Sequence, residues 1–319
     1  MVVKLTNGTE LPIENHKVRI VQKCDLVPIE QRLKAIEEGG YNTFLLRSRD
    51  IFMDMLTDSG TNAMSDNQLA AMMVADDAYA GSESFYRLRD AVEEIFGLKY
   101  SMPVHQGRAA EHLIAKHFVK PGDVIPMNYH FTTTRAHFEL GGGKVLEIFT
   151  DDALITESKV QFKGNIDLKK LQDVIDKYGK EKISFVRMEA TTNLIGGQPF
   201  SMQNLKEVYE LANKYGIPVI VDCSLISENA YLIHKREVGY DKKSIKEIVK
   251  EMMGYCDLMY LSGRKSCSVR GGLISTNKKE YYDGILPLLP LFEGFATYGG
   301  MSTKEVEAMA VGIREMVDV

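Results

Sequence analysis

Short apolar runs alternate with amphipathic helices along most of this chain, and this alternation limits the possible folds more than any other feature. Strands are predicted for LKYSMPVH (from Leu98), DVIPM, KVLEI, ISFVRMEA, IPVIVD and LMYLS. Helices are predicted for SESFYRLRDAVEEIF, QGRAAEHLIAKHF, LKKLQDVIDKYG and SMQNLKEVYELANKYG. Such alternation is typical of an α/β domain with a mostly parallel sheet and helices on both faces.

The N-terminal part follows a different pattern, with one helix-like segment, PIEQRLKAIEEGG, and one strand-like segment, YNTFLL. We therefore expect residues 1–55 to form an N-terminal arm or part of a small domain, and residues 56–319 to form a large domain. Two segments, SIKE at Ser244–Glu247 and STKE at Ser302–Glu305, have the sequence of helix capping boxes.

Composition excludes several classes of function. The chain has 319 residues, 45% of them hydrophobic, which is enough for a large core, and its net charge of −5 attracts neither nucleic acid nor an anionic membrane. Its 4 cysteines form no CxxC pair and no zinc-ligand spacing. The first residues lack the apolar core of a signal peptide, and no apolar run reaches the ~20 residues of a membrane helix. These features favour a cytoplasmic protein.

Two residues at strand ends suggest cofactor chemistry. Lys265 follows LMYLS, where it could be a solvated surface lysine or a lysine that forms a Schiff base. Asp222 ends IPVIVD, where a buried carboxylate needs a cation, supplied either by a protein side chain or by the protonated ring nitrogen of a cofactor. One predicted helix, SIKEIVKEMM, and one predicted strand lie between the two residues, so we expect both at the same sheet edge. Asp followed by Lys in this arrangement is the pattern of pyridoxal phosphate (PLP) enzymes.

A phosphate could bind where VHQGRAAEH passes from strand to helix. Gln106, Gly107 and Arg108 occupy the helix N-terminus, where backbone N–H groups and the helix dipole favour an anion. A tight strand–helix turn is the alternative explanation. Ser262 and Arg264 could add phosphate contacts.

Other polar and aromatic positions are less informative. Phe131, just past DVIPM, could stack on a planar cofactor or belong to the core. Four histidines, His105, His112, His130 and His137, form i,i+7 pairs that are too far apart to share a metal ion. The segment ELGGGKV lacks GxGxxG, so no dinucleotide site is expected.

Longer segments carry a resemblance that extends from about Gly40 to the C-terminus. They include DDAYAGSESFYRL, HQGRAAE, FTTTRAH, TTNLIGGQPFSM, ENAYLI, SGRKSC and EGFATYGG. In these segments the chain resembles the β-eliminating lyases, the family of the tyrosine phenol-lyases and tryptophanases. The resemblance implies the aspartate-aminotransferase-like fold (fold type I), bound PLP, and a homo-oligomer (dimer or tetramer) whose active sites are shared between subunits.

The resemblance also implies the cofactor contacts. Lys265 is then the Schiff-base lysine and the base that removes the Cα proton, Asp222 pairs with the pyridinium and Phe131 stacks on the ring. Asn193 approaches the ring's 3′-oxygen. The phosphate is surrounded by Gln106, Gly107, Arg108, Ser262 and Arg264.

Substrate contacts follow from the same resemblance. Tyr79 corresponds to a tyrosine that reaches in from the neighbouring subunit and protonates the leaving group, and Thr57 and Ser59 lie near the active site. Thr132 matches a threonine of the phenol-lyases where tryptophanases carry aspartate, which favours phenol over indole as the leaving group.

The chain departs from the family pattern at several points. Potassium activates the family, and the resemblance places a monovalent-cation site at Gly60 and Asp77. Asp77 stands where members usually have Glu, and the VRGG segment is one residue shorter. Leu225 replaces an Arg near the cofactor's 3′-oxygen. The resemblance also leads us to expect that the C-terminal small domain, which supplies the Arg that binds the substrate carboxylate, is absent from this chain.

We therefore expect a PLP-dependent carbon–carbon lyase that converts a small-molecule amino acid, L-tyrosine, and water to phenol, pyruvate and ammonia. One alternative is a truncated or degenerate subunit that binds PLP without activity. The other is β-elimination on tryptophan or a cysteine conjugate.

Overall fold

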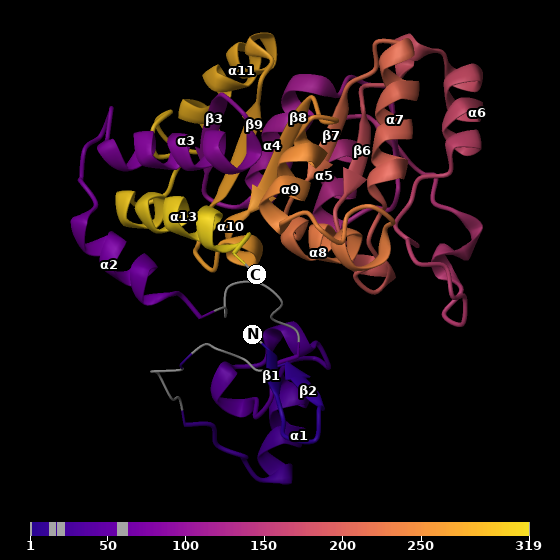
Figure 1. Ribbon diagram of the computed structural model, residues 1–319. Coiled ribbons are helices and arrows are strands. Elements are labelled where there is room, and N and C mark those ends of the chain that lie inside the picture. The colour runs from indigo at the N-terminus through magenta and orange to yellow at the C-terminus, as the bar shows by residue number, and fades with distance from the viewer. Residues whose placement is uncertain (1, 13–16, 18–22, 56–62, 319) are drawn as a thin grey trace. The chain divides into compact units, whose positions relative to one another are not determined.

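The computed structural model describes residues 2–12, 17, 23–55 and 63–318 (Figure 1). The chain divides into two compact units, Met1–Asp58 and Ser59–Val319. Each unit is described by itself below.

The N-terminal unit contains a hairpin that the sequence analysis did not predict. Strands β1 (Val2–Lys4) and β2 (Glu10–Pro12) pair in antiparallel fashion. Their connection contains the Asn-Gly pair that is typical of hairpin turns. Gly8 has φ 85°, and the side chain of Asn7 accepts a hydrogen bond from the N–H of Thr9 at 3.0 Å.

A helix and two 3₁₀ turns complete the described part of this unit. They are α1 (Ile29–Glu38), η1 (Thr43–Leu45) and η2 (Ser48–Asp50). The strand predicted for YNTFLL is wrong, because η1 occupies this segment. Tyr41 has φ 61°, a left-handed backbone that no strand allows, and the side chain of Asn42 accepts the N–H of Phe44 at 3.0 Å, which starts a turn.

The large unit is built on a seven-stranded sheet in the order β3-β9-β8-β7-β6-β4-β5. The strands are β3 (Tyr100–Val104), β4 (Val124–Met127), β5 (Lys144–Glu147), β6 (Val186–Glu189), β7 (Val219–Asp222), β8 (Leu258–Ser262) and β9 (Gly272–Thr276). Strand β9 is antiparallel to both its neighbours, and the remaining pairs are parallel. The prediction of a mostly parallel sheet is confirmed, but β9 was missed.

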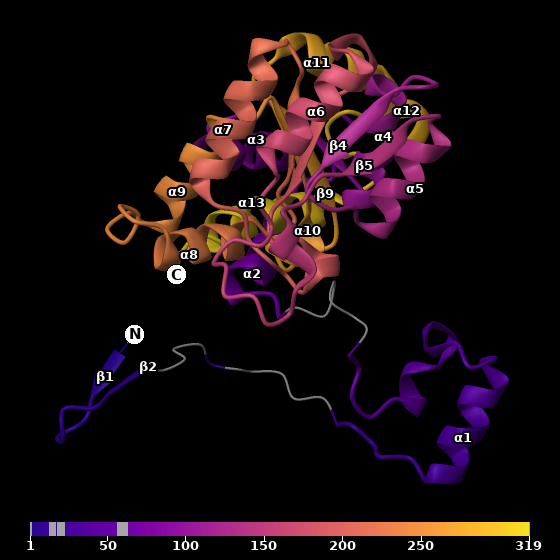
Figure 2. The same cartoon turned by 90° about the vertical axis from the view of Figure 1, so that its right-hand side faces the viewer.

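Helices cover both faces of this sheet (Figure 1; Figure 2). One apolar cluster joins the sheet to α3 (Glu83–Phe96), α6 (Leu168–Tyr178), α7 (Met202–Lys214), α8 (Ile226–Arg236), α9 (Ile245–Met253) and α13 (Thr303–Glu315). A second cluster joins it to α4 (Gly107–Phe118), α5 (Thr132–Leu140), α11 (Lys279–Ile285) and α12 (Leu289–Phe292). Successive residues of β7 alternate between the clusters, as the pleat requires: Val219 and Val221 lie in the first and Ile220 in the second.

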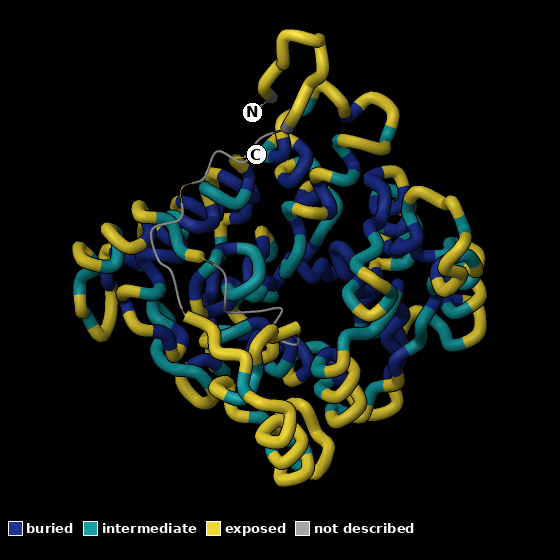
Figure 3. The backbone as a smooth tube through the Cα atoms, turned by 90° about the horizontal axis from the view of Figure 1, so that it is seen from below, coloured by how far each residue is buried: buried dark blue, intermediate teal, exposed yellow. Residues whose placement is uncertain are grey.

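The buried strands run through the interior, and exposure increases toward the outer helices (Figure 3). The remaining short elements of this unit are α2 (Asp66–Val74), α10 (Gly263–Ser266), η3 (Asp151–Leu154), η4 (Lys180–Lys182), η5 (Asn193–Ile195) and η6 (Leu286–Leu288).

Both predicted capping boxes are present, at Ser244 with Glu247 and at Ser302 with Glu305. A third, at Ser65 with Gln68, begins α2. Among the helices of the described residues, none is long and apolar enough to cross a membrane.

The connection between α12 and α13 packs closely on β3, and glycine is required for this contact. Gly299 has φ 55°, and a Cβ atom there would overlap the carbonyl oxygen of Pro103. Gly216 also has a positive φ, 71°, but faces open space.

We expect Gly216→Ala to lose about 1–2 kcal/mol of unfolding free energy from backbone strain alone. Gly299→Ala should lose roughly 1–3 kcal/mol more, because overlap is added to the strain.

Urea unfolding followed by circular dichroism measures both losses. Equal losses in the two variants would contradict the described packing of Gly299 on β3.

Candidate functional site

The parallel strands place most of the predicted site residues at one edge of the sheet. Strands β3, β4, β6, β7 and β8 all run in the same direction, so the segments that follow them meet at their carboxyl ends. These segments carry Gln106 and Gly107 after β3, Phe131 after β4, Asn193 after β6, Asp222 at the end of β7, and Ser262, Arg264 and Lys265 at the end of β8.

Two serines tie the segment that carries Lys265 to the turn after Asp222. The hydroxyl of Ser266 donates to the carbonyl oxygens of Cys223 at 3.2 Å and of Ser224 at 2.5 Å. The N–H of Ser262 donates to the hydroxyl of Ser224 at 3.0 Å. The Nζ atom of Lys265 lies 4.8 Å from the centre of the Phe131 ring. The structure therefore brings the predicted lysine, aspartate and phenylalanine into one region.

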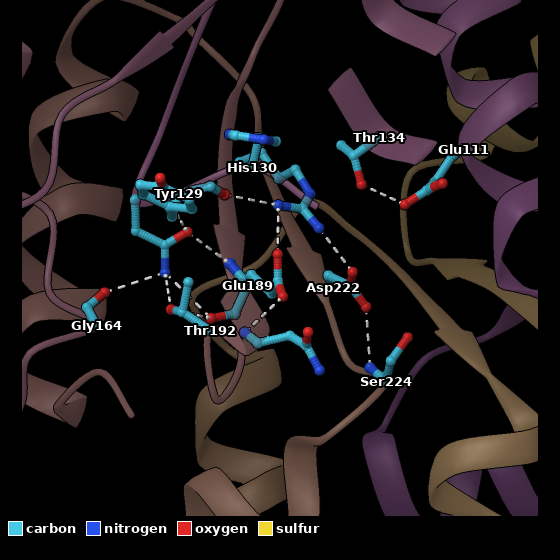
Figure 4. A network of polar contacts seen from close by, with 12 residues as sticks. Glu111, Tyr129, His130, Thr134, Gly164, Glu189, Thr192, Asp222 and Ser224 are labelled. Atoms are coloured by element: carbon cyan, nitrogen blue, oxygen red, sulfur yellow. Dashed lines mark hydrogen bonds and ion pairs between the residues drawn. The ribbon is translucent and has the colours of Figure 1, made fainter. Parts of the chain in front are cut away.

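Asp222 is 5% exposed and has two fixed partners. Its Oδ2 atom lies 2.7 Å from Nη2 of Arg187, and its Oδ1 atom accepts the N–H of Ser224 at 3.0 Å (Figure 4). The sequence analysis considered two cations as partners of Asp222, a protein side chain and the ring nitrogen of a cofactor. The structure contains the first of these, the guanidinium of Arg187. An ionised carboxylate has about four acceptor positions, so these two hydrogen bonds do not exhaust its capacity.

Arg187, which the sequence analysis did not single out, is 0% exposed. Its Nη1 atom donates to Oε2 of Glu189 at 3.0 Å and to the carbonyl of Tyr129 at 3.1 Å, and its Nε donates to the hydroxyl of Tyr260 at 2.8 Å. Burial alone would lower the pKa of Arg187, but the neighbouring Tyr260 and carboxylates raise it well above its usual value. A sequence signal for Arg187 was nevertheless present, because two ionisable residues, Arg187 and Glu189, lie inside the apolar strand ISFVRMEA.

Glu111, on α4, is a second buried carboxyl group that was missed. It accepts hydrogen bonds from Thr133 at 2.6 Å, from Thr134 (Figure 4), and from the hydroxyl of Tyr260 at 3.3 Å. Burial raises the pKa of Glu111 to about 7, although Arg187 and the threonine hydrogen bonds oppose the shift.

The N-terminus of α4 has the form of a phosphate cradle. No side-chain hydrogen bond caps the helix at Gln106, and the first N–H groups of a helix have no partner within it. A Cβ atom on Gly107 would lie 3.1 Å from Cβ of Ser262, and one on Gly272 would lie 2.6 Å from the carbonyl carbon of Gln106. Gly272 is therefore required for the close approach of β9 to α4, and Gly107 packs tightly on β8. The bare N–H groups, with Arg108 exposed on the first turn of α4, suit a phosphate group.

The segment after β6 is held in a strained conformation. Thr191 has φ 54°, which is rare for a β-branched residue. Its hydroxyl donates to the carbonyl of Leu225 at 2.6 Å, and its N–H donates to Asn229 at 3.0 Å. Two residues later, the N–H of Asn193 donates to Oε1 of Glu189 at 2.9 Å. Strain of this kind is common at functional sites, and the bond to Glu189 fixes the backbone of the predicted residue Asn193 close by.

The residues predicted to contact the substrate or a cation are exposed wherever the structure describes them. Tyr79 is 72% exposed and stacks on Phe295 at 5.1 Å, with its edge toward Tyr298 at 5.8 Å. Thr132 is exposed at the start of α5, next to Phe131, and Asp77 is exposed. Thr57, Ser59 and Gly60 lie outside the described residues. Across residues that the structure describes, no group of at least 3 His, Cys, Asp or Glu side chains could hold a metal ion.

The site contains the groups that suit PLP. They are an amine in Lys265, a buried carboxylate in Asp222, an aromatic ring in Phe131 and an anion-binding helix N-terminus at α4. Residues 54–316 match the family model described as β-eliminating lyase. The chain belongs to the β-eliminating lyase family. The predicted family and lyase class are therefore confirmed.

Curated β-eliminating lyases are similar to nearly the whole chain. A tyrosine phenol-lyase of Symbiobacterium sp. (strain SC-1) is 48% identical over 306 residues, which are 96% of this chain and 67% of that protein. A tyrosine phenol-lyase of Pasteurella multocida (strain Pm70) is 47% identical over 308 residues, with the same coverage. The chain thus spans about two thirds of the length of these relatives.

Solved structures share the fold at low sequence identity. SepCysS in complex with the N-terminal domain of SepCysE has a TM-score of 0.57 and 15% identity, covering 85% of this chain and 70% of that one. A structure of SPT with PLP has a TM-score of 0.55 and 15% identity, covering 79% of this chain and 58% of that one. The predicted fold type I is confirmed.

The raised pKa of Glu111 predicts a pH dependence of stability. The folded pKa of about 7 exceeds the usual 4.5, so the folded state holds more protons than the unfolded state between these values. The unfolding free energy of the wild type should therefore fall as pH rises from 4.5 to 7, by a Glu111 contribution on the order of 3 kcal/mol.

Glu111→Gln cannot ionise and should lack this contribution. Urea unfolding at several pH values compares the two proteins, and the stability of the variant relative to the wild type should rise across this window. Parallel pH profiles would show that Glu111 titrates normally.

Proposed function

We propose that this β-eliminating lyase uses PLP to convert L-tyrosine and water to phenol, pyruvate and ammonia. Support for the substrate comes from the tyrosine phenol-lyases that are 47–48% identical to the chain. The observation that carries the proposal is the placement of Lys265 and Asp222 at one sheet edge, joined through Ser224 and Ser266.

The bound cofactor would supply an electron sink for the pair of electrons left when the Cα proton departs. In this proposal Lys265 anchors the cofactor and removes the Cα proton at its Nζ atom. Asp222 holds the ring nitrogen protonated, Phe131 covers the ring and Asn193 approaches its 3′-oxygen. The phosphate is held by Gln106, Gly107, Arg108, Ser262 and Arg264.

Tyr79 would act as the general acid that protonates the ring carbon of the leaving phenol. Its exposure suits a residue that serves the site of a neighbouring subunit, as in a homo-oligomer such as a dimer or homotetramer. Thr132, Thr57 and Ser59 would contact the substrate.

The proposal extends to the domains and the surroundings of the site. Residues 56–319 would form the PLP-binding large domain, and residues 1–55 an arm or part of a small domain. Gly60 and Asp77 would lie at a potassium site, and the enzyme would work in the cytoplasm.

The test uses Lys265→Ala with Lys279→Ala as the matched control, since Lys279 is exposed and pairs with Asp283 at 2.6 Å. We expect wild type and Lys279→Ala to develop a visible absorption band with PLP and to form phenol and pyruvate from L-tyrosine. Lys265→Ala should lose the band and at least about 10²-fold in kcat.

An unchanged band in Lys265→Ala would refute the cofactor assignment. A band without pyruvate in the wild type would favour an inactive PLP-binding subunit. Pyruvate from S-ethylcysteine or tryptophan but not from tyrosine would assign the leaving group to another class.

Leu225 provides a second test, because the family has an arginine there. Leu225 lies half-buried at the N-cap of α8, beside Thr191. We expect Leu225→Arg to raise kcat for L-tyrosine by roughly tenfold, the effect of one charged hydrogen bond of about 1.5 kcal/mol. Leu225→Met is the control and should leave kcat unchanged. A lower kcat in Leu225→Arg would show that the site has adapted to leucine.

A further inference from the structure

Three adjacent strands place a row of ionisable side chains beneath the proposed ring site. Glu189 on β6 is the register partner of Asp222 on β7, and Asp222 is the register partner of Tyr260 on β8. Arg187 lies two residues before Glu189 and therefore on the same face of β6. All four residues are buried. The row belongs to the sheet itself, so its geometry does not depend on loops.

The ion pairs in this row share one positive charge between two carboxylates. Arg187 is 2.7 Å from Asp222 and 3.0 Å from Glu189. Its Nε atom is used by the neutral hydroxyl of Tyr260, which also donates to Glu111. These pairs therefore leave an excess of about one negative charge, and an uncompensated buried charge is costly. Burial raises the pKa of Glu189 and the neighbouring Asp222 adds to this rise, whereas Arg187 opposes it.

Glu189 is well placed to balance Arg187. Its Oε2 atom pairs with the guanidinium, while its Oε1 atom accepts the N–H of Asn193 at 2.9 Å (Figure 4). Both oxygens are thus used within the protein, whereas Asp222 ends its strand at the edge where the site residues meet. The charge of Glu189 offsets that of Arg187, so the charge of Asp222 remains effective toward a group at this edge.

We propose that Glu189 is a positioning residue that offsets the charge of Arg187 and thereby keeps Asp222 selective for a cofactor whose ring nitrogen is protonated. This inference rests on the proposed function, since it assumes that PLP binds with its ring nitrogen toward Asp222. It adds a residue that acts through Asp222 and Arg187 and makes no contact with the substrate.

The experiment compares the affinity of the full chain for PLP and for the carbon analogue in which C–H replaces the ring nitrogen. Both dissociation constants are measured by spectroscopic titration. Their ratio reports how strongly the protein prefers a ring that can carry a positive charge. Glu189→Gln keeps the size of the side chain and an oxygen that can accept the N–H of Asn193, but it removes the negative charge. The charge of Arg187 is then offset by Asp222 alone. The preference for PLP should fall about tenfold, while affinity for the analogue changes little.

Glu307→Gln is the matched control. Glu307 is also 5% exposed and pairs with an arginine, Arg87, at 2.6 Å, but it lies on α13. This variant should keep the wild-type preference for PLP.

Glu111→Gln is the second variant, for use if Glu189→Gln does not fold. Its effect should be in the same direction but smaller, because Glu111 forms no ion pair with Arg187 and its hydrogen-bond link to Arg187 passes through Tyr260.

The outcomes separate this inference from the proposed function. A preference that is unchanged in Glu189→Gln, or an equal loss of affinity for both compounds, would overturn the inference while PLP binding itself stands. Failure of the wild type to bind either compound would overturn the proposed function and the inference with it.

Discussion

The guanidinium of Arg187 is the interaction on which the candidate site depends. It lies inside the sheet and bonds to Glu189 on its own strand, to Asp222 and Tyr260 on the next two, and to the carbonyl of Tyr129 after β4. A cation this deeply buried is stable only if its charge and N–H groups are all satisfied. The same bonds that satisfy it fix the carboxylate at the sheet edge, so the stability of the sheet and the order of the site have one cause.

Much of the fold and of the site was predictable from local patterns. Buried parallel strands are short apolar runs, and their carboxyl ends must meet at one edge, so the positions of Asp222 and Lys265 followed from the chain order alone. The capping boxes at Ser244 and Ser302 were predictable for a similar reason, because they depend on two residues that are 3 positions apart.

What the sequence did not show depends on contacts between distant segments. Strand β9 is rich in small residues and runs against its neighbours, so its pairing with β3 and β8 has no local signal. YNTFLL has the composition of a strand but forms a turn, because Asn42 caps it and Tyr41 has a positive φ. Arg187 is conspicuous inside the apolar strand ISFVRMEA, but its role was not predictable, since its bonds to Asp222 and Tyr260 reach other strands.

A crystal structure of the protein grown with PLP tests the central claim most directly. The account predicts continuous density between Nζ of Lys265 and the aldehyde carbon of the cofactor. It also predicts the ring nitrogen within hydrogen-bond distance of Asp222, with Arg187 still paired to that carboxylate. Cofactor density elsewhere on the protein, or a carboxylate of Asp222 turned away from the ring, would contradict it.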